Sequence, residues 1–318
     1  MENEGSQTLC GFFCLNFQLI YLNKMTYSIS DLERLTGVHS HTIRIWEQRY
    51  HALTPNRTEG NTRFYDDQQL KKLLNIVSLN QAGFKISKIC NLSDQDMNQL
   101  LDQQYFKQSD NQWADFYVTS LIKYGLAFNE IKFNACLQEV IHQVDVAETY
   151  HQIIYPLLVR LGLMWRKDNI CPAHEHFITN QIKLKLSAAI DRCRSVNKSA
   201  KTWLLFLPED EDHDIGLMMA AYMLHMHEQN VIYLGSKVPL SSLKAVISTT
   251  NVDAVLFFMV SNRLEEAAQN YINQLSDICL STRIHLAGNS LVIERLKNIN
   301  HINCFKSFEE FESAIKNP

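Results

Sequence analysis

The period of the hydrophobic pattern changes near residue 200, and this change limits the possible folds more than any other feature of the chain. Between residues 113 and 195, apolar side chains recur with the spacing of an α-helix. After a polar linker at 197–201, short unbroken apolar runs alternate with helical segments. Unbroken apolar strands between helices predict a parallel sheet that is covered on both faces. The sequence therefore predicts an α and α/β multidomain protein.

The α/β part spans residues 201–318. Its strands are expected at residues 202–207, 231–234, 254–260, 284–287 and 303–305. A helix is expected after each strand, which predicts a flavodoxin-like, doubly wound parallel five-stranded sheet. In such sheets, ligands bind beyond the carboxyl ends of the strands.

Residues 112–195 are expected to form a four-helix bundle with short loops. Its helices are expected at about residues 112–124, 128–142, 145–163 and 171–194. Pro156 lies inside the third helix and is expected to kink it, because proline lacks an N–H and crowds the carbonyl four residues earlier. Pro172 suits the first turn of the fourth helix.

A smaller helical domain is expected at residues 25–102. Ser30 and Glu33 have the spacing of a capping box, so they predict the start of a first helix. This helix would end at Gly37, and Ser40 is expected to cap the next one.

That second helix is expected at residues 41–50. A polar stretch at 54–65 carries the turn and β-favouring residues of a hairpin, and a third helix is expected at 67–81. Two short helices that are joined by a glycine turn and followed by a hairpin predict a winged helix-turn-helix.

The chain begins with an apolar segment, residues 9–22, which two glutamates precede. Its 14 residues are fewer than the roughly 20 that a helix needs to span a bilayer. We interpret residues 1–24 as an upstream extension of a chain whose natural start is near Met25. A buried extra element and a membrane anchor are the alternatives.

The composition excludes several classes of protein. None of the ten glycines is placed for a G-x-G-x-x-G turn or a phosphate-binding P-loop. The net charge of −4, from 30 basic and 34 acidic residues, means that any contact with nucleic acid must be local. Eight cysteines without a C-x-x-C pair are expected to be reduced thiols of a cytoplasmic protein. We expect no membrane partner.

A local basic region lies between residues 44 and 65, where four arginines stand against two glutamates. The arginines are Arg44, Arg49, Arg57 and Arg63. Guanidinium groups can grip phosphates or guanine edges, and a wing can touch the neighbouring groove of duplex DNA. The region therefore predicts a DNA-binding surface. A helical hairpin for protein contact, with solvated arginines, is the alternative.

An acidic loop with the sequence E-D-H-D-I-G follows the first predicted strand of the sheet, at residues 211–216. A neutral imidazole such as that of His213 is a good ligand for transition metals, and a neighbouring carboxylate can hold its tautomer. Gly216 would let the backbone approach a large planar ligand closely. A solvated acidic surface loop is the alternative.

A third group of residues falls at one end of the expected bundle. Trp165 ends the third helix, while Glu175 and His176 begin the fourth, so the three side chains can meet. An aromatic core residue together with charges that suit a helix start is the alternative.

The segment 28–65 resembles the winged helix-turn-helix of MerR-type regulators, and Trp46-Glu47 with residues 57–60 resembles the CarA, CarH and LitR type. The resemblance implies a second helix in the major groove and a homo-oligomer, a dimer or tetramer, on a double-stranded DNA operator. The DNA contacts that it implies are Thr42, Arg44, Arg49, Tyr50, Arg57, Arg63 and Tyr65. For Tyr50, Phe64 and Tyr65, packing and phosphate contact both stay open, and packing is the preferred interpretation.

The loop at 211–216 resembles the cobalamin-binding signature D/E-x-H-x-x-G of methionine-synthase-like modules. The resemblance implies that His213 is the lower axial ligand of cobalt, the metal site of the chain. It also implies that Glu211 is the hydrogen-bond partner of His213 and that Gly216 belongs to the cofactor site.

Two later parts of that signature depart from the family pattern. Phe258 replaces a serine, and Asn289, after Gly288, replaces the second glycine of a Gly-Gly pair. The resemblance implies that these positions line the slot for the nucleotide tail of the cofactor. Val238 lies in a strand and loop that match the family better.

Trp165, Glu175 and His176 resemble the Trp and Glu-His signature of the light sensors of this type. The resemblance implies that they pack against the upper axial group of adenosylcobalamin. Photoreceptor members carry a histidine after that tryptophan, where this chain has Arg166, and His174 is a candidate substitute.

Together these resemblances imply a transcription regulator that senses adenosylcobalamin, a light-dependent repressor that releases DNA when the cobalt–carbon bond is photolysed. The second hypothesis is a MerR-type regulator that has lost cobalamin binding and uses its C-terminal domains for oligomerisation or a protein partner. The third is a corrinoid enzyme module. The DNA-binding domain and the lack of a substrate barrel argue against it, so we expect no enzyme.

Overall fold

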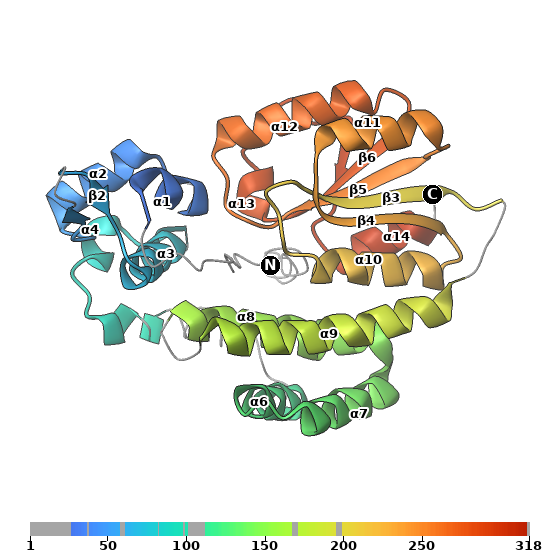
Figure 1. The fold of residues 1–318 in the computed structure, drawn as a ribbon, viewed down its shortest axis with the longest axis horizontal. Helices are drawn as coiled ribbons and strands as arrows, with labels where there is room; N and C mark the ends of the chain where they lie inside the picture. Colours follow the sequence, from blue (N-terminus) through green and yellow to red (C-terminus); the bar gives the residue numbers. More distant parts are fainter. Residues whose placement is uncertain are drawn as a thin grey trace, which may run out of the picture.

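Figure 1 shows a small helical domain, a layer of long helices and a sheet with helices on both faces. The computed structural model describes residues 27–36, 38–57, 61–81, 83–97, 99–100, 112–166, 171–194 and 199–316. The expected extension at 1–24, Gly37, residues 58–60 of the expected hairpin and residues 101–111 lie outside the described residues.

The N-terminal domain is a winged helix-turn-helix, as predicted. Its elements are α1 (Ile29–Thr36), α2 (Ser40–Tyr50), β1 (Asn56–Arg57), β2 (Arg63–Phe64), α3 (Asp67–Gln81) and α4 (Ile86–Ile89). The two short strands pair antiparallel and form the wing. Tyr27 adds a backbone bridge to Tyr65, which ties the chain before α1 to the base of the wing.

The capping box of α1 lies two residues earlier than the sequence pattern suggested. The backbone N–H of Asp31 donates to Oγ of Ser28 at 3.1 Å, and Ser28 N–H donates to the Asp31 carboxylate at 2.9 Å. Glu33, the expected box partner of Ser30, instead accepts a hydrogen bond from the hydroxyl of Ser40. Ser40 is therefore not the N-cap of α2, because its hydroxyl links α2 to α1.

Helix α3 is buried on two faces. The predicted apolar face, with Leu70, Leu73, Leu74 and Val77, is buried in the core of the domain. Ile76, on another face, joins a second cluster with Ala52, Leu79, Ile89 and Met97, and Val159 of the bundle packs against this cluster. The winged helix-turn-helix domain is therefore docked on the bundle through α3.

The bundle has the predicted order of helices. Its elements are α6 (Gln112–Leu126), α7 (Glu130–Thr149), the π-helical turn η1 (Tyr150–Ile154), α8 (Tyr155–Arg166) and α9 (Pro172–Cys193). The break predicted between residues 142 and 145 occurs at Asp145, whose φ of 75° is not helical. The Asp145 carboxylate accepts the N–H of Glu148 at 2.9 Å and so caps the segment that follows.

The expected kink at Pro156 takes the form of a π-helical turn. Residues 150–154 form this wider turn directly before Pro156, and the N–H of Tyr155 donates to the carbonyl of Tyr150, five residues earlier. Such a turn re-pairs backbone groups that a proline inside an α-helix would disturb. Pro172 occupies the first turn of α9, as predicted.

The C-terminal domain is a parallel sheet of five strands, β3 (Thr202–Pro208), β4 (Asn230–Val238), β5 (Ala254–Met259), β6 (Arg283–Gly288) and β7 (Ile302–Cys304). The spatial order is β4-β3-β5-β6-β7, with every pair parallel. This is the flavodoxin-like order that the sequence predicted. Strand β4 runs further than expected, to Val238, with register shifts along β3.

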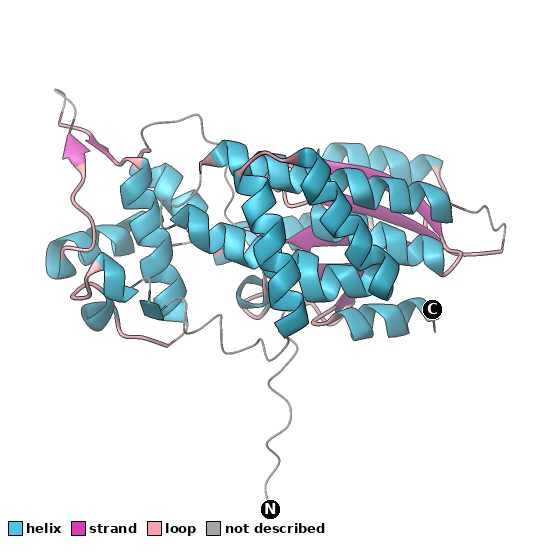
Figure 2. Cartoon of the chain, turned by 90° about the horizontal axis from the view of Figure 1, so that it is seen from below, coloured by secondary structure: helices cyan, strands magenta, loops and turns pink. Residues whose placement is uncertain are grey.

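Helices cover both faces of the sheet in Figure 1, and Figure 2 shows the bundle helices in front of its strands. The sheet separates two apolar clusters. The covering helices are α10 (Ile215–Met226), α11 (Leu240–Thr249), α12 (Glu265–Ile278), α13 (Ser290–Ile293) and α14 (Phe308–Lys316). Alternate residues of β5 face opposite sides. Leu256 and Phe258 join α10, α14 and the bundle in one cluster, whereas Phe257 and Met259 join α11 and α12 in the other. The bundle is thus stacked on the Phe258 side.

No helix within the described ranges is long and apolar enough to cross a membrane. The cysteines described in the structure are free thiols: Cys90, Cys136, Cys171, Cys193, Cys279 and Cys304.

Candidate cofactor and DNA-binding sites

The candidate cofactor site lies where the chain reverses its direction of winding. From β3 the chain moves to β4 on one side and then returns to β5 on the other side of β3. The loops after β3 and β5 therefore meet at a topological switch point, where open parallel sheets bind ligands. The loop after β3 is the E-D-H-D-I-G segment of the sequence.

Glu211 is fully buried and ties these two loops together. Its carboxylate accepts the N–H of Val260 at 2.9 Å, the N–H of Ser261 at 2.8 Å and the Ser261 hydroxyl at 3.0 Å. A guanidinium nitrogen of Arg263 lies 3.4 Å away. Burial alone would raise the pKa of Glu211, but His213, Arg263 and the Ser261 N–H hold it well below its usual range. The residue is a fixed, buried carboxylate.

The two ring nitrogens of His213 have different surroundings. Nδ1 contacts the Glu211 carboxylate, as the resemblance implied. Nε2 is buried and has no hydrogen-bond partner among the residues that the structure describes. Burial would lower the pKa of His213, but Glu211 first, and then Asp212 and Glu175, raise it above its ordinary value. An imidazole with Nδ1 fixed by a carboxylate and Nε2 unused is the arrangement of a metal-ligating histidine.

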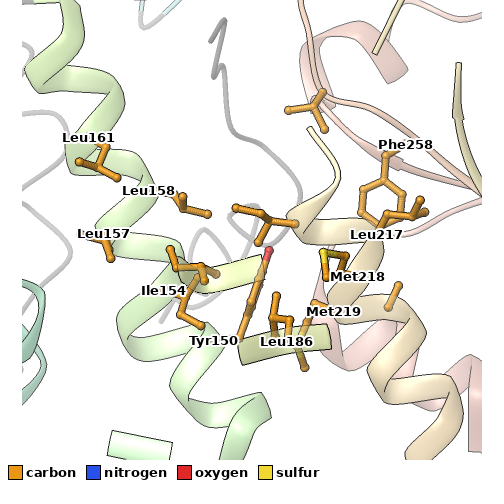
Figure 3. Close-up of a cluster of buried hydrophobic side chains, with 14 of the residues drawn as sticks. Tyr150, Ile154, Leu157, Leu158, Leu161, Leu186, Leu217, Met218, Met219 and Phe258 are labelled. Atoms are coloured by element: carbon orange, nitrogen blue, oxygen red, sulfur yellow. The ribbon is translucent and has the colours of Figure 1, made fainter. Parts of the chain in front are cut away.

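The space beside Gly216 is filled by aromatic side chains. A Cβ added at Gly216 would lie 3.1 Å from Cε1 of Phe258 and 3.7 Å from the hydroxyl of Tyr150. Both side chains are buried, and Figure 3 shows them on either side of Met218 at the start of α10. The histidine therefore fits an axial ligand of cobalt, whereas the residues near Gly216 do not leave room for a further buried group.

Gly288 and Asn289 sit at the carboxyl end of β6. Gly288 has a φ of 132°, and a Cβ there would lie 2.2 Å from the carbonyl oxygen of Met259, so the position requires glycine. Asn289 is buried and caps α13, because its Oδ1 accepts the N–H of Leu291 at 3.0 Å. Its Nδ2 donates to Asn262 at 3.0 Å. The Asn289 amide is thus used to hold loops together.

Val238 lies at the carboxyl end of β4, but its side chain packs into the cluster on the other face of the sheet from Phe258. The structure does not bring Val238 and Phe258 together.

The bundle residues approach the His213 loop. Glu175, in the first turn of α9, is buried, and Nδ1 of His176 lies 2.9 Å from its carboxylate. Burial raises the pKa of Glu175, and the charges of His176, His213 and Lys183 oppose this rise. Nζ of Lys183 lies 2.7 Å from the carboxylate of Asp214. The middle of α9 is therefore tied to the loop by an ion pair.

Trp165 is buried at the end of α8, in the same apolar cluster as Phe258. The side chain of Arg166 lies outside the described part of the chain. His174, the candidate substitute for the expected histidine, contacts Cys171 and Phe128 in this structure. Its Nδ1 accepts the N–H of Cys171 at 3.2 Å, and its ring stacks on Phe128 at 4.7 Å.

Two residues of the site have no signal in the sequence pattern. Ser261 and Arg263 hold Glu211 from about 50 residues further along the chain. The guanidinium of Arg263 also grips Asp210 at 2.7 and 2.9 Å. Only the topology, which places the ends of β3 and β5 side by side, could have identified them.

The candidate DNA-binding residues divide into exposed and packed groups. Arg44, Arg49 and Arg57 are exposed. The guanidinium of Arg49 lies over the ring of Tyr50, 5.8 Å from its centroid. Thr42 is half-buried.

Arg63 and Tyr65 both contact the carboxylate of Glu47 in α2. Nε of the half-buried Arg63 lies 3.7 Å from the Glu47 carboxylate. Tyr65 is fully buried, and its hydroxyl donates to Glu47 at 2.6 Å. Burial and then the hydrogen bond to Glu47 raise the pKa of Tyr65. Tyr65 therefore packs between the wing and α2, and its expected role as a DNA contact is replaced by packing.

Two family descriptions match the chain. Residues 27–96 match the MerR HTH family regulatory proteins. Residues 118–190 match the B12 binding domain, and this match falls on the bundle. The two domains are therefore present in the order that the sequence resemblances implied.

Two relatives are similar over most of their length. The HTH-type transcriptional repressor CarH of Myxococcus xanthus is 26% identical over 253 residues, 79% of this chain and 84% of that protein. The repressor CarA of the same organism is 23% identical over 267 residues, 83% of this chain and 87% of that protein.

Among solved structures, the monomethylamine corrinoid protein of Methanosarcina barkeri has the same fold, with a TM-score of 0.52 at 12% identity. The match covers 62% of this chain and 96% of that one. The bundle and sheet together thus have the fold of a corrinoid protein. The chain is a transcription regulator that joins a MerR-type helix-turn-helix domain to a B12-binding domain, and it is similar in this to the CarH and CarA repressors.

Proposed function

We propose that the chain is a repressor that binds an operator in the dark with adenosylcobalamin and releases it in light. The observation that carries this proposal is the His213 ring, with Nδ1 fixed by Glu211 and Nε2 buried and unused among the described residues. The similarity to CarH and CarA supports the repressor part of the proposal.

On this proposal, His213 would hold cobalt from below through Nε2. Glu211 keeps the ring oriented, and Ser261 and Arg263 keep Glu211 in place. When bound, adenosylcobalamin would supply a cobalt–carbon bond that light can cleave. Trp165, Glu175 and His176 are the bundle residues that we assign to the upper side of the cofactor.

The signal reaches the DNA-binding domain through helix α8. Trp165 stands near the end of this helix, and Val159 of the same helix packs against the α3 cluster of the helix-turn-helix. A ligand shifts an equilibrium only if it binds one state better than the other. A change around Trp165 can therefore alter how the DNA-binding domain is held, and with it the assembly that binds DNA.

Arg44, Arg49 and Arg57 are the exposed residues that would contact the DNA duplex. We further propose that the active form is a dimer or tetramer in the cytoplasm and that the chain catalyses no reaction.

The test is size-exclusion chromatography of the purified chain with saturating adenosylcobalamin, in the dark and after green light. The proposal expects a coloured oligomer in the dark and a smaller species after light. It also expects operator binding only by the dark form. A chain that carries no colour in either run would contradict the proposal.

A second function is favoured by the aromatic filling beside Gly216. Phe258 lies 3.1 Å from a Cβ at that glycine. The second hypothesis is therefore a sheet domain that has lost its cofactor and serves oligomerisation or a protein partner. On this hypothesis, the chain without any corrinoid oligomerises and binds its operator fully, and added corrinoid changes neither property.

A further inference from the structure

Phe258 occupies the buried space next to the candidate axial histidine. Its side chain is 1% exposed, and it lies beside Ala287 across the β5–β6 pair. Its ring lies 3.1 Å from the position of a Cβ on Gly216, three residues after His213. Tyr150, 2% exposed, approaches the same glycine from the bundle. Small residues at 216 and 287 therefore leave a space that Phe258 fills from within the protein.

Asn289 closes the same edge of the sheet. Its amide joins the loop after β6 to Asn262 in the loop after β5 and also caps α13. The Asn289 N–H donates to the carbonyl of Met259 at 2.7 Å. The loops that flank Phe258 are thus held together by the protein's own hydrogen bonds.

A corrinoid that binds through His213 must release its own lower base, and a bulky base then needs a place of its own. A buried place beside Gly216 would require Phe258 to leave a close-packed core, and inserting atoms into such a core forces side chains and backbone to move. A corrinoid without the base can bind without displacing Phe258.

We propose that this site takes corrinoids whose lower nucleotide base is absent or remains in solvent, and that Phe258 sets this preference. The proposal rests on the proposed function, since it requires that His213 holds a corrinoid. It names the ligand class of that site: a corrinoid ring without a buried nucleotide.

The first experiment compares two ligands that share the upper adenosyl group. The full chain is titrated in the dark with adenosylcobinamide and with adenosylcobalamin, and binding is followed by visible absorption and by calorimetry. The expected result is that adenosylcobinamide binds at least as tightly as adenosylcobalamin. Tighter binding of adenosylcobalamin would overturn the proposal while leaving the proposed function intact. Binding of neither ligand would overturn both.

A matched pair of variants distinguishes the effect of the space beside Gly216 from the general effect of removing a buried ring. Phe258→Ala opens the space beside Gly216, and Phe257→Ala removes an equally buried ring from the opposite face of the same strand. We expect Phe258→Ala to tighten adenosylcobalamin binding about tenfold, a change typical of a hydrophobic pocket, and to leave adenosylcobinamide within about threefold. Phe257→Ala is expected to leave the ratio of the two affinities unchanged.

An unchanged ratio in folded Phe258→Ala would show that Phe258 does not set the preference. If either alanine variant fails to fold, Phe258→Leu and Phe257→Leu are compared in the same way, and the wild-type ratio alone still decides whether the base is buried.

Discussion

The backbone N–H of Ser261 donates a 2.8 Å hydrogen bond to the carboxylate of Glu211. Because Glu211 also contacts His213, the loop after β5 helps to position the histidine. Glu211 is fully buried, and the Arg263 guanidinium lies 3.4 Å from the same carboxylate oxygen that accepts the Ser261 N–H. His213, the candidate axial ligand, is therefore positioned by contacts from the loops after two strands. The buried Glu211 carboxylate therefore fixes the position of His213, although both residues lie in a loop.

Glu211→Gln is expected to destabilise the chain by about 3 kcal/mol, because it removes one partner of a buried charge cluster. The matched control is Asp212→Asn. Asp212 pairs with Lys237 at 3.0 Å on the surface, so its loss is expected to cost less than about 1 kcal/mol. Urea unfolding of both variants checks this. Equal losses would mean that Glu211 is not the structural anchor of the site.

Gly288→Ala is expected to lower the free energy of unfolding by about 3 kcal/mol, since φ is 132° and the new Cβ would lie 2.2 Å from the Met259 carbonyl oxygen. Gly83→Ala is the control, because Gly83 also has a positive φ, 93°, but open space around its Cβ. Its cost is expected to be about 1 kcal/mol. Thermal or urea unfolding measures both. If both variants lose the same unfolding free energy, backbone strain alone explains the loss, and the clash with Met259 does not contribute.

The stability of the sheet domain is expected to fall in mild acid because of His285. Its side chain is buried between Trp203 and Phe305, and burial, with a smaller effect of Arg283, lowers the pKa of His285 from 6.5 to about 4. Below pH 6.5 the unfolded chain binds a proton at this residue while the folded chain does not. Stability is therefore lost as the pH falls from 6.5 towards 4, by up to about 3 kcal/mol.

The check is the free energy of unfolding between pH 7 and 4 for the wild type and for His285→Phe, which keeps a flat ring in the stack. The difference between the two curves isolates His285 from the carboxylates that titrate in the same range. Parallel curves would show that His285 is not the residue responsible.

Arg44→Ala and Arg49→Ala are each expected to weaken DNA binding by about 1–3 kcal/mol if the arginine contacts a base. If it contacts a phosphate, the slope of log affinity against log salt concentration is expected to become shallower by about one. Both residues are exposed on α2. Arg192→Ala, an exposed position near the end of α9, is the control and is expected to have no effect. Fluorescence anisotropy with a DNA duplex at several salt concentrations measures all three. Equal effects of Arg192 and Arg44 would place the DNA surface elsewhere.

The sequence allowed the elements and their order to be predicted because local rules govern them. Leu70, Leu73, Leu74 and Val77 at helical spacing predict α3, and the short unbroken apolar run at 202–207 after a polar linker predicts a buried strand. The pairing of Glu211 with His213 could also be expected, since the two residues are neighbours in one loop.

The remaining features depend on contacts between distant segments. Ser28 rather than Ser30 caps α1 because Glu33 is used by Ser40 of the next helix. Tyr65 is buried because Glu47 lies beneath it. Arg263 reaches Glu211 only because β3 and β5 are neighbours in the sheet. No periodicity within one segment carries such information.

The most direct test of the account is the visible spectrum of the chain after dark incubation with excess adenosylcobalamin and, in parallel, adenosylcobinamide, for the wild type and His213→Ala. The account predicts that the wild type retains a coloured corrinoid with the spectrum of a nitrogen-ligated cobalt. With adenosylcobinamide, which has no lower base of its own, His213→Ala should lose the colour or show the spectrum of a corrinoid without a lower nitrogen ligand; the fold of the variant is verified by circular dichroism. A colourless wild type, or the same adenosylcobinamide spectrum for both proteins, would contradict the account.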